Sequence, residues 1–316
     1  MEWPRRLGLP TLALTASTRV GPILARAAAA TDPVAGHVVS VYAGAVNLRI
    51  GADLVTVARS SVGGLPCGIG LDDGFEPRAA GVRPGDPVTV IGRVVRLGPV
   101  SIDLAAARPW SPNLPHRPIP VDLAERAAVL RSAVEPRGAG RAPLCAADRR
   151  RPTGSASPTR LVDDLFAARL RAFRAAARHG APAAVASAGR ALVGLGVGLT
   201  PSGDDVLVGF SAGRAAIGAP AASALATDLA VDWSAWADGR TTDVAVAFHR
   251  TAAQGDFAER LHDALAAILD GPVASIPDAA TCAAAWGATS GRDTLRGVLV
   301  ALESVVSAAR PVVGAA

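Results

Sequence analysis

The apolar residues of this 316-residue chain change their spacing part-way along, and that change limits the folds open to it. Between Gly36 and about Leu104 they come in short β-branched runs, separated by turn residues such as Gly63-Gly64 and Pro84-Gly85-Asp86. Such runs are typical of strands, and their close spacing predicts an antiparallel sheet or a small barrel. We expect the proline-rich passage at 108–120 to end this β region.

Beyond this passage the spacing becomes helical. Leu161, Leu165, Leu170 and Phe173 recur at intervals that put them on one helix face, and Gly180 with Pro182 predicts the end of that helix. Further helices are expected at 121–134, 183–193, 203–217, 221–236, 243–254, 257–269, 278–286 and 292–309. The polar stretch at 135–158 is interpreted as a mobile linker or surface loop.

Together these patterns predict an α+β protein. We expect a β-rich N-terminal domain at 1–120, with an antiparallel sheet or small barrel, and a helix and linker at 121–158. An all-α C-terminal domain at 159–316 is expected to carry the functional site.

Composition excludes several function classes. The three cysteines, Cys67, Cys145 and Cys282, lie far apart without a CxxC pair, so neither a disulfide framework nor a zinc site is expected, and Cys67 is interpreted as an inert thiol. The net charge of +5 invites a nucleic-acid partner, but the chain has no lysine and its arginines gather nowhere except at 149–151, interpreted as solvated linker.

No apolar run is long and uncharged enough to span a bilayer, and Pro10 interrupts the apolar segment near the start, unlike a secretory signal. We therefore expect a cytoplasmic protein with no nucleic-acid or membrane partner.

The segment GLGVGLTPSGDDVLVG, at 194–209, is the main candidate for chemistry. Its glycines at 194, 196 and 198 permit unusual backbone angles and close approach of a ligand. Thr200 before Pro201 predicts an N-cap and the first helical residue, with N–H groups near Ser202 and Gly203 pointing outward toward an anion. Asp204 and Asp205 would repel that anion, unless one binds a cation or carries a proton. The alternative is a helix that packs closely through its glycines, capped by Thr200 and Asp204.

A second segment repeats this one 88 positions later: Ser290 to Gly297 matches Ser202 to Gly209 in an S-G-x-D-x-L-x-G pattern. Two such helix starts can face one pocket, to which they would bring hydroxyl groups and the carboxylates of Asp205 and Asp293. In the second copy Arg292 replaces Asp204 and suits a carboxylate or phosphate. The alternative is a duplication kept for helix packing.

A third segment, RTTD at 240–243, offers hydroxyls and a carboxylate, and N-capping of the next helix is the favoured interpretation. The histidines, which include His249, show no HxxxH or HExxH spacing, so no histidine-based metal site is expected.

Three segments, GLGVGLTPSGDDVLVG, RTTDVAVAFHRTAAQGDFAERLHDAL and GATSGRDTLRGVL, occur in that order and resemble the AllH-type subunit family of oxamate carbamoyltransferase. The earlier GHVVSVYAGAVNL and DLAAARPWSPN also look like this family. The resemblance implies a protein of purine-nitrogen catabolism that acts with partner subunits, one similar to acyl-CoA synthetases. The implied reaction moves a carbamoyl group between oxalurate and phosphate, giving oxamate and carbamoyl phosphate. Ala245 and Ala288 stand where the family pattern has serine and histidine.

The leading hypothesis is a transferase subunit whose site lies between the two helix starts, with 240–243 as a wall. Asp205, Asp293 and Ser202 are the predicted catalytic residues, and the two carboxylates would position the reacting nitrogen or hold a divalent cation. No cofactor beyond that optional cation is predicted. The predicted substrate-binding residues are Gly196, Gly198, Thr200, Gly203, Asp204, Thr241, Thr242, Thr289, Ser290, Gly291 and Arg292. The rival hypothesis is a non-catalytic small-anion-binding subunit or sensor with the chemistry on a partner protein, and a nucleic-acid module ranks third.

Overall fold

The computed structural model describes residues 11–28, 34–135, 158–217, 231–309 of the chain and divides it into two compact units. Unit 1 consists of residues 1–113 and 257–260, and unit 2 of residues 114–256 and 261–316. Cys145, the arginines at 149–151 and nearly all of the expected linker lie outside the described residues, as does the part of the expected helix at 221–230.

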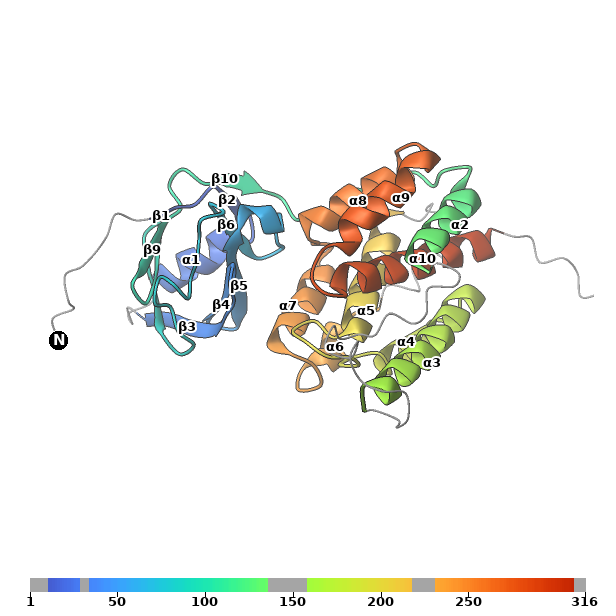
Figure 1. Ribbon diagram of the computed structural model, residues 1–316, viewed down its shortest axis with the longest axis horizontal. Coiled ribbons are helices and arrows are strands. Elements are labelled where there is room, and N and C mark those ends of the chain that lie inside the picture. The colour runs from blue at the N-terminus through green and yellow to red at the C-terminus, as the bar shows by residue number, and fades with distance from the viewer. Residues whose placement is uncertain (1–10, 29–33, 136–157, 218–230, 310–316) are drawn as a thin grey trace, which may run out of the picture. The chain divides into compact units, whose positions relative to one another are not determined.

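Unit 1 is a ten-stranded sheet that curls around one helix (Figure 1). The strand order is β1-β9-β8-β7-β3-β4-β5-β6-β2-β10. The elements are β1 (Thr11–Leu12), β2 (Thr15–Ser17), α1 (Val20–Ala28), β3 (Val34–Val41), β4 (Ala45–Ile50), β5 (Asp53–Arg59), the 3₁₀ turn η1 (Ser60–Val62), β6 (Gly68–Leu71), β7 (Pro87–Ile91), β8 (Val94–Leu97), β9 (Val100–Asp103) and β10 (Arg108–Trp110).

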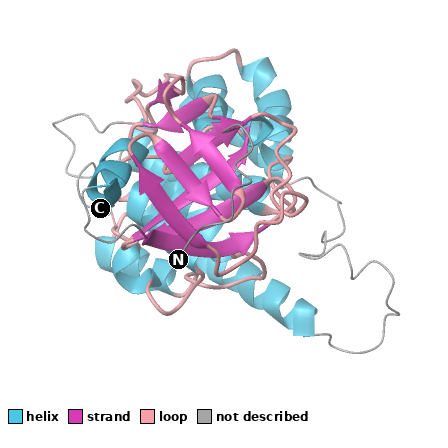
Figure 2. Ribbon diagram, turned by 90° about the vertical axis from the view of Figure 1, so that its left-hand side faces the viewer, coloured by secondary structure: helices cyan, strands magenta, loops and turns pink. Residues whose placement is uncertain are grey.

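The β-branched runs form this sheet because their apolar side chains meet in one core. Val46, Leu48 and Val57 are fully buried there, and α1 adds Val20 and Ile23 from inside the curl. The strongly twisted strands are shown in magenta in Figure 2.

The sheet is mixed, because the pairs β1/β9, β2/β10 and β5/β6 are parallel whereas the other neighbours are antiparallel. The segment at 60–67, which contains η1, carries the chain back before β6 begins, so β6 runs in the same direction as β5. The expected fold class, a β-rich start followed by a helical region, is confirmed. The β region ends within the proline-rich passage as expected, although the first residues of that passage, Arg108–Trp110, still form a strand that pairs with β2. Helix α1 was not expected.

Unit 2 is helical. Its elements are α2 (Leu123–Val134), α3 (Pro158–His179), α4 (Pro182–Arg190), α5 (Ser202–Ala216), α6 (Ser234–Ala237), α7 (Asp243–Ala252), α8 (Glu259–Leu269, whose first two residues belong to unit 1), the 3₁₀ turn η3 (Val273–Ser275), α9 (Ile276–Ala284) and α10 (Ser290–Ala308).

Helices α5 and α10 form the centre of unit 2 and cross one another in Figure 1. Each is buried around most of its circumference, including its polar first turn, as expected for a helix surrounded by others. Helices α2, α3 and α9 pack against α10, and α7 and α3 pack against α5. The repeated sequence pattern is therefore at the core of the helical unit.

Candidate functional site

The glycine-rich loop before α5 adopts a backbone that depends on glycine. Gly194, Gly196 and Gly198 have φ angles of 72°, 133° and 102°, as the sequence predicts. A Cβ atom on Gly194 would lie 2.1 Å from the carbonyl oxygen of Arg240, and one on Gly196 would lie 2.5 Å from the backbone nitrogen of Ser202. The loop is thus folded tightly against the starts of α5 and α7.

The start of α5 differs from the expected cap. The helix begins at Ser202, and Pro201 occupies the cap position without a side-chain hydrogen bond, so the assignment of Thr200 as N-cap is wrong. The Thr200 hydroxyl instead lies 2.8 Å from the hydroxyl of Ser290, on α10. Thr200 therefore joins the two helix starts.

The backbone N–H groups of the first turns are used within the protein. Gly203 donates to the carbonyl of Leu195 at 2.8 Å, and Gly291 donates in the same way to Trp286 at 2.9 Å. The expectation that the Gly203 N–H points outward to an anion is therefore wrong, because each preceding loop folds back over its helix start. The loops pack so closely that a Cβ on Gly203 would lie 1.9 Å from the carbonyl oxygen of Leu192.

The two copies of the repeat cross through their last glycines. A Cβ on Gly209 would lie 1.9 Å from the carbonyl oxygen of Thr294, and a Cβ on Gly297 would lie 1.9 Å from that of Val206. These contacts are equivalent under the shift of 88 positions, so α5 and α10 are related by an approximate two-fold axis. The repeated spacing within the chain thus allows close helix packing and also brings both helix starts together.

At these starts, the serine of each copy interacts with the carboxyl group of the other copy, and the threonine before each helix interacts with the carboxyl group of its own. Ser290 and Thr200 form hydrogen bonds with Asp205, and Ser202 and Thr289 form them with Asp293. Asp205 is 8% exposed and Asp293 is 0% exposed. Nevertheless, one oxygen of each carboxyl group, Oδ2, has no hydrogen-bond partner among the described residues. Buried acceptors of this kind are normally satisfied, so the two unpartnered oxygens are an exception that needs an explanation.

The pKa values of both carboxyl groups are shifted upward, that of Asp205 more than that of Asp293. Burial raises the pKa of Asp205 well above its ordinary value of 3.8; hydrogen bonds from Ser290 and Thr200 oppose the rise, and the charges of Asp293 and Asp204 add to it. Burial also raises the pKa of Asp293, against the opposing charge of Arg296.

Arg296 is a part of the site that the sequence analysis missed. Its Nη1 lies 2.6 Å from Oδ1 of Asp293, one helical turn earlier in α10. The three-residue spacing of opposite charges on a helix is a signal that could have found this pair. The equivalent position in α5 is occupied by Val208, so the charge distribution departs from the two-fold arrangement.

Asp204 points away from this pair into a second, buried network. Its Oδ2 accepts from the Thr241 hydroxyl at 2.6 Å and from the Gly194 N–H at 3.1 Å, while Oδ1 lies 2.8 Å from Nε2 of His249. Asp204 and His249 are 0% and 1% exposed. The two residues are 45 positions apart in the chain, and no local sequence pattern connects them. The network holds the glycine loop and α7 onto α5.

The third segment caps α7 as the favoured interpretation expected. Thr242 accepts from the Ala245 N–H at 3.1 Å, and its hydroxyl donates to the carbonyl oxygen of Leu199 in the glycine loop. Of the other predicted residues, Arg292 is exposed at the start of α10. The structure thus brings together a site core of six side chains: Thr200, Ser202, Asp205, Thr289, Ser290 and Asp293.

In the described parts of the chain, no group of three or more histidine, cysteine, aspartate or glutamate residues is arranged to hold a metal ion. Within those same parts, no helix has the length and apolar character needed to cross a membrane.

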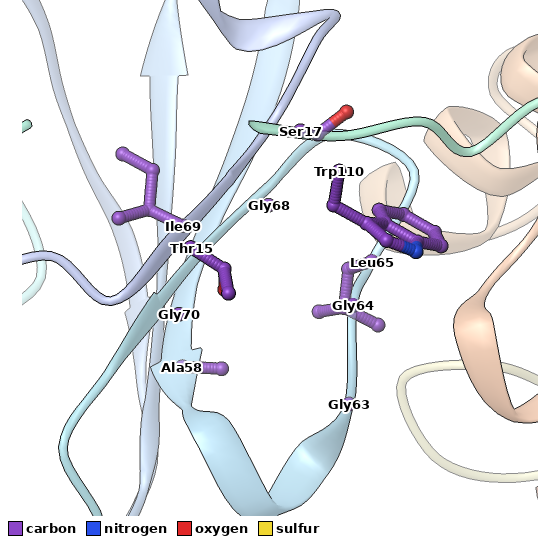
Figure 3. A pocket seen from close by; sticks show the side chains of 10 residues that line it. All are labelled: Thr15, Ser17, Ala58, Gly63, Gly64, Leu65, Gly68, Ile69, Gly70 and Trp110. Atoms are coloured by element: carbon purple, nitrogen blue, oxygen red, sulfur yellow. The ribbon is translucent and has the colours of Figure 1, made fainter. Parts of the chain in front are cut away.

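Unit 1 contains a small pocket between β2, β5 and the glycine-rich segment that leads into β6 (Figure 3). The indole of Trp110 covers Gly64 on one side, and Thr15 and Ala58 line the other. The space open to a water-sized molecule is about 10 Å³, which accommodates about one water molecule. The pocket is therefore too small for a substrate.

Comparison with known protein families gives two matches. Residues 192–302 match the family described as oxamate carbamoyltransferase subunit AllH, and residues 13–109 match the AllH family N-terminal domain. The first match contains both helix starts and the whole site core. No curated protein and no solved structure matches the chain.

Proposed function

Because the chain belongs to the AllH family of oxamate carbamoyltransferase subunits, we propose that its α5–α10 site handles the carbamoyl group during transfer between oxalurate and phosphate. The observation that carries this proposal is the pair of buried carboxyl groups, each with one unpartnered oxygen.

The chemistry of a carbamoyl group suits this pair. Its –NH2 offers two hydrogen-bond donors and its carbonyl offers an acceptor, so it is recognised by carboxyl groups of which one is ionised and one is protonated. The raised pKa of Asp205 favours its protonated form, which has an O–H to donate. A second ionised carboxylate in the same buried place would repel the carbonyl oxygen.

The proposed reaction uses the same groups. A phosphate oxygen attacks the carbamoyl carbon, the bond from that carbon to the oxamate nitrogen breaks, and the nitrogen takes a proton from Asp205. The hydroxyl proton of the attacking phosphate then restores the proton of the pair, so atoms and charges balance. Arg292, exposed beside Asp293, is our candidate for the anionic end of the substrates, since the N–H groups of Gly203 and Gly291 are already occupied.

The test is the substitution Asp205→Asn, assayed by phosphate release from carbamoyl phosphate in the presence of oxamate. We expect turnover to be abolished while the thermal unfolding transition stays cooperative, because the amide keeps the shape of the carboxyl but cannot give up its proton. Asp278→Asn, an exposed aspartate in the first turn of α9, is the matched control and should keep full activity. Retained turnover in Asp205→Asn, or loss of its folded state, would contradict the catalytic role.

A second candidate is a non-catalytic small-anion-binding subunit whose partner performs the chemistry. It is favoured by Ala288, which is exposed next to Thr289 in this site and stands where the resemblance implies a histidine. The two candidates differ in the activity of the purified full-length chain with carbamoyl phosphate and oxamate. Turnover by the chain alone supports the first, whereas turnover that appears only with partner subunits and survives Asp205→Asn supports the second.

A further inference from the structure

Two carboxyl groups related by a two-fold axis would share a single proton equally. The site core comes close to this symmetry, because each aspartate is bonded by the serine of the opposite helix and the threonine before its own. Two charge differences depart from this symmetry: the exposed Arg292 has Asp204 as its counterpart in α5, and Arg296, which bonds Asp293, has the uncharged Val208.

We propose that Arg296 is a positioning residue that makes the two carboxyl groups unequal, holding Asp293 as the carboxylate so that the proton of the pair lies on Asp205. The inference rests on the proposed function, in which Asp205 is the proton donor. It adds that Asp293 accepts hydrogen bonds from the substrate, and that Arg296 determines which aspartate is the donor and which is the acceptor.

The geometry supports this division. The Arg296 guanidinium donates to Oδ1 of Asp293 at 2.6 Å, a short charge-assisted bond that stabilises the ionised form. Arg296 is 24% exposed in its side chain and Asp293 1%, so water screens the pair only in part. Among the described residues Asp205 forms no ion pair, and its bonded neighbours are the neutral hydroxyls of Thr200 and Ser290.

Most of the other charged groups near α5 are in ion pairs of their own: the buried Asp204 with His249 of α7, Arg250 of α7 with Asp238, and Arg174 and Arg178 of α3 with Glu303 of α10. Arg214 lies in the last turn of α5, and Asp243 of α7 and Arg292 of α10 are exposed. Asp204 acts on Asp205 in the same direction as Asp293, since its charge raises the pKa of Asp205. Arg296 forms an ion pair with Asp293 and so distinguishes one carboxyl of the pair from the other.

The unequal pair has a consequence for the ligand. A protonated Asp205 and an ionised Asp293 place one donor and one acceptor side by side, which is the complement of a carboxamide edge with its carbonyl oxygen and N–H. A pair with both groups ionised would accept two N–H bonds but reject the carbonyl. Arg296 therefore determines that the site takes an uncharged amide end in a single orientation.

The experiment is a carboxyl titration of the full-length chain labelled with ¹³C at the aspartate side chains, followed by NMR without substrate. Asp205→Asn and Asp293→Asn identify the two signals. We expect the wild-type chain at neutral pH to show a protonated Asp205 and an ionised Asp293. In Arg296→Gln the titration midpoint of Asp293 should rise by about one to three pH units, the usual effect of removing an adjacent arginine. In Arg296→Lys, which keeps the positive charge, the midpoint should stay close to that of the wild type.

The matched control is Arg250→Gln, which removes an arginine from an exposed ion pair of the same unit and should move neither titration. An unchanged Asp293 titration in Arg296→Gln, or a wild-type chain in which Asp293 holds the proton, would overturn the inference. If Arg296→Gln fails to fold, the inference is still tested by which of the two aspartates holds the proton in the wild-type chain and by the titration of Asp293 in Arg296→Lys.

A kinetic arm separates this inference from the proposed function. The acidic limb of the pH–rate profile should move upward with the Asp293 titration in Arg296→Gln, a shift that lost packing alone does not produce. The two proposals can fail separately. If Asp205 and Asp293 titrate as expected but neither the chain alone nor its complex with partner subunits transfers a carbamoyl group, the proposed function is refuted and the assigned protonation of the pair stands.

Discussion

Replacing Gly209 by alanine tests the crossing of α5 and α10 that brings the two halves of the site together. The added Cβ would lie 1.9 Å from the carbonyl oxygen of Thr294, whereas unstrained C···O contacts begin at about 3.3 Å. The helices must therefore separate by roughly 1.4 Å at this point. The obstacle is helical backbone, which cannot rotate away as the end of a side chain can.

The magnitude follows from two opposing effects. Overpacking a well-packed core costs about 1–3 kcal/mol, with this backbone contact near the upper end, while alanine in a helix interior regains about 0.5–1 kcal/mol relative to glycine. We expect a net loss of about 2 kcal/mol in the free energy of unfolding of unit 2. For a unit of its size, this corresponds to a fall of about 4–8 °C in Tm, measured by differential scanning calorimetry.

Two further variants make the test specific. Gly21→Ala in α1 is the control, since no other atom lies within 4 Å of its added Cβ, and its Tm should stay within about 1 °C of the wild type or rise. Gly297→Ala repeats the geometry from the other helix and should cost as much as Gly209→Ala. The double variant should cost less than the sum, because one separation relieves both contacts. A wild-type Tm for Gly209→Ala, or an equal loss in Gly21→Ala, would refute the reasoning.

Two other predictions concern the buried acids. Because the pKa of Asp205 is higher in the folded than in the unfolded state, its stabilising contribution is complete below about 3.8 and is lost as pH rises through the raised value. Asp205→Asn should therefore gain stability over the wild type as pH rises, in urea denaturation at a series of pH values; a parallel pH dependence for both proteins would exclude this explanation. His249→Ala leaves Oδ1 of Asp204 buried without its partner and should cost about 1–3 kcal/mol in the same assay, whereas Arg250→Ala on the exposed face of α7 should cost less than about 0.5 kcal/mol.

Local patterns predicted the features that depend on neighbouring residues. The division into strands and helices, the positive φ angles of the glycine loop and the Thr242 cap are of this kind. Helix α1 escaped notice because Gly21 and Pro22 stand in its first turn, where a proline is tolerated but resembles a break.

The features that the sequence did not reveal depend on residues far apart in the chain or on how a loop folds back. The bond between Asp204 and His249 joins α5 to α7, and neither residue has a neighbour that points to the other. The use of the Gly203 N–H by Leu195 depends on the path of the intervening loop, whose residues fit a solvent-facing turn equally well. The repeat can be found in the sequence, but only the structure shows that the serine of each helix bonds the aspartate of the other.

The crossing of α5 and α10 also has a consequence for how the protein folds. The two halves of the site are 88 residues apart in the chain, so closing the intervening loop costs entropy before the contacts of the site repay it. During synthesis the first helix start must remain without its partner until the second has been made. The site is therefore a product of the folding of the whole helical unit, and its formation reports completion of that fold.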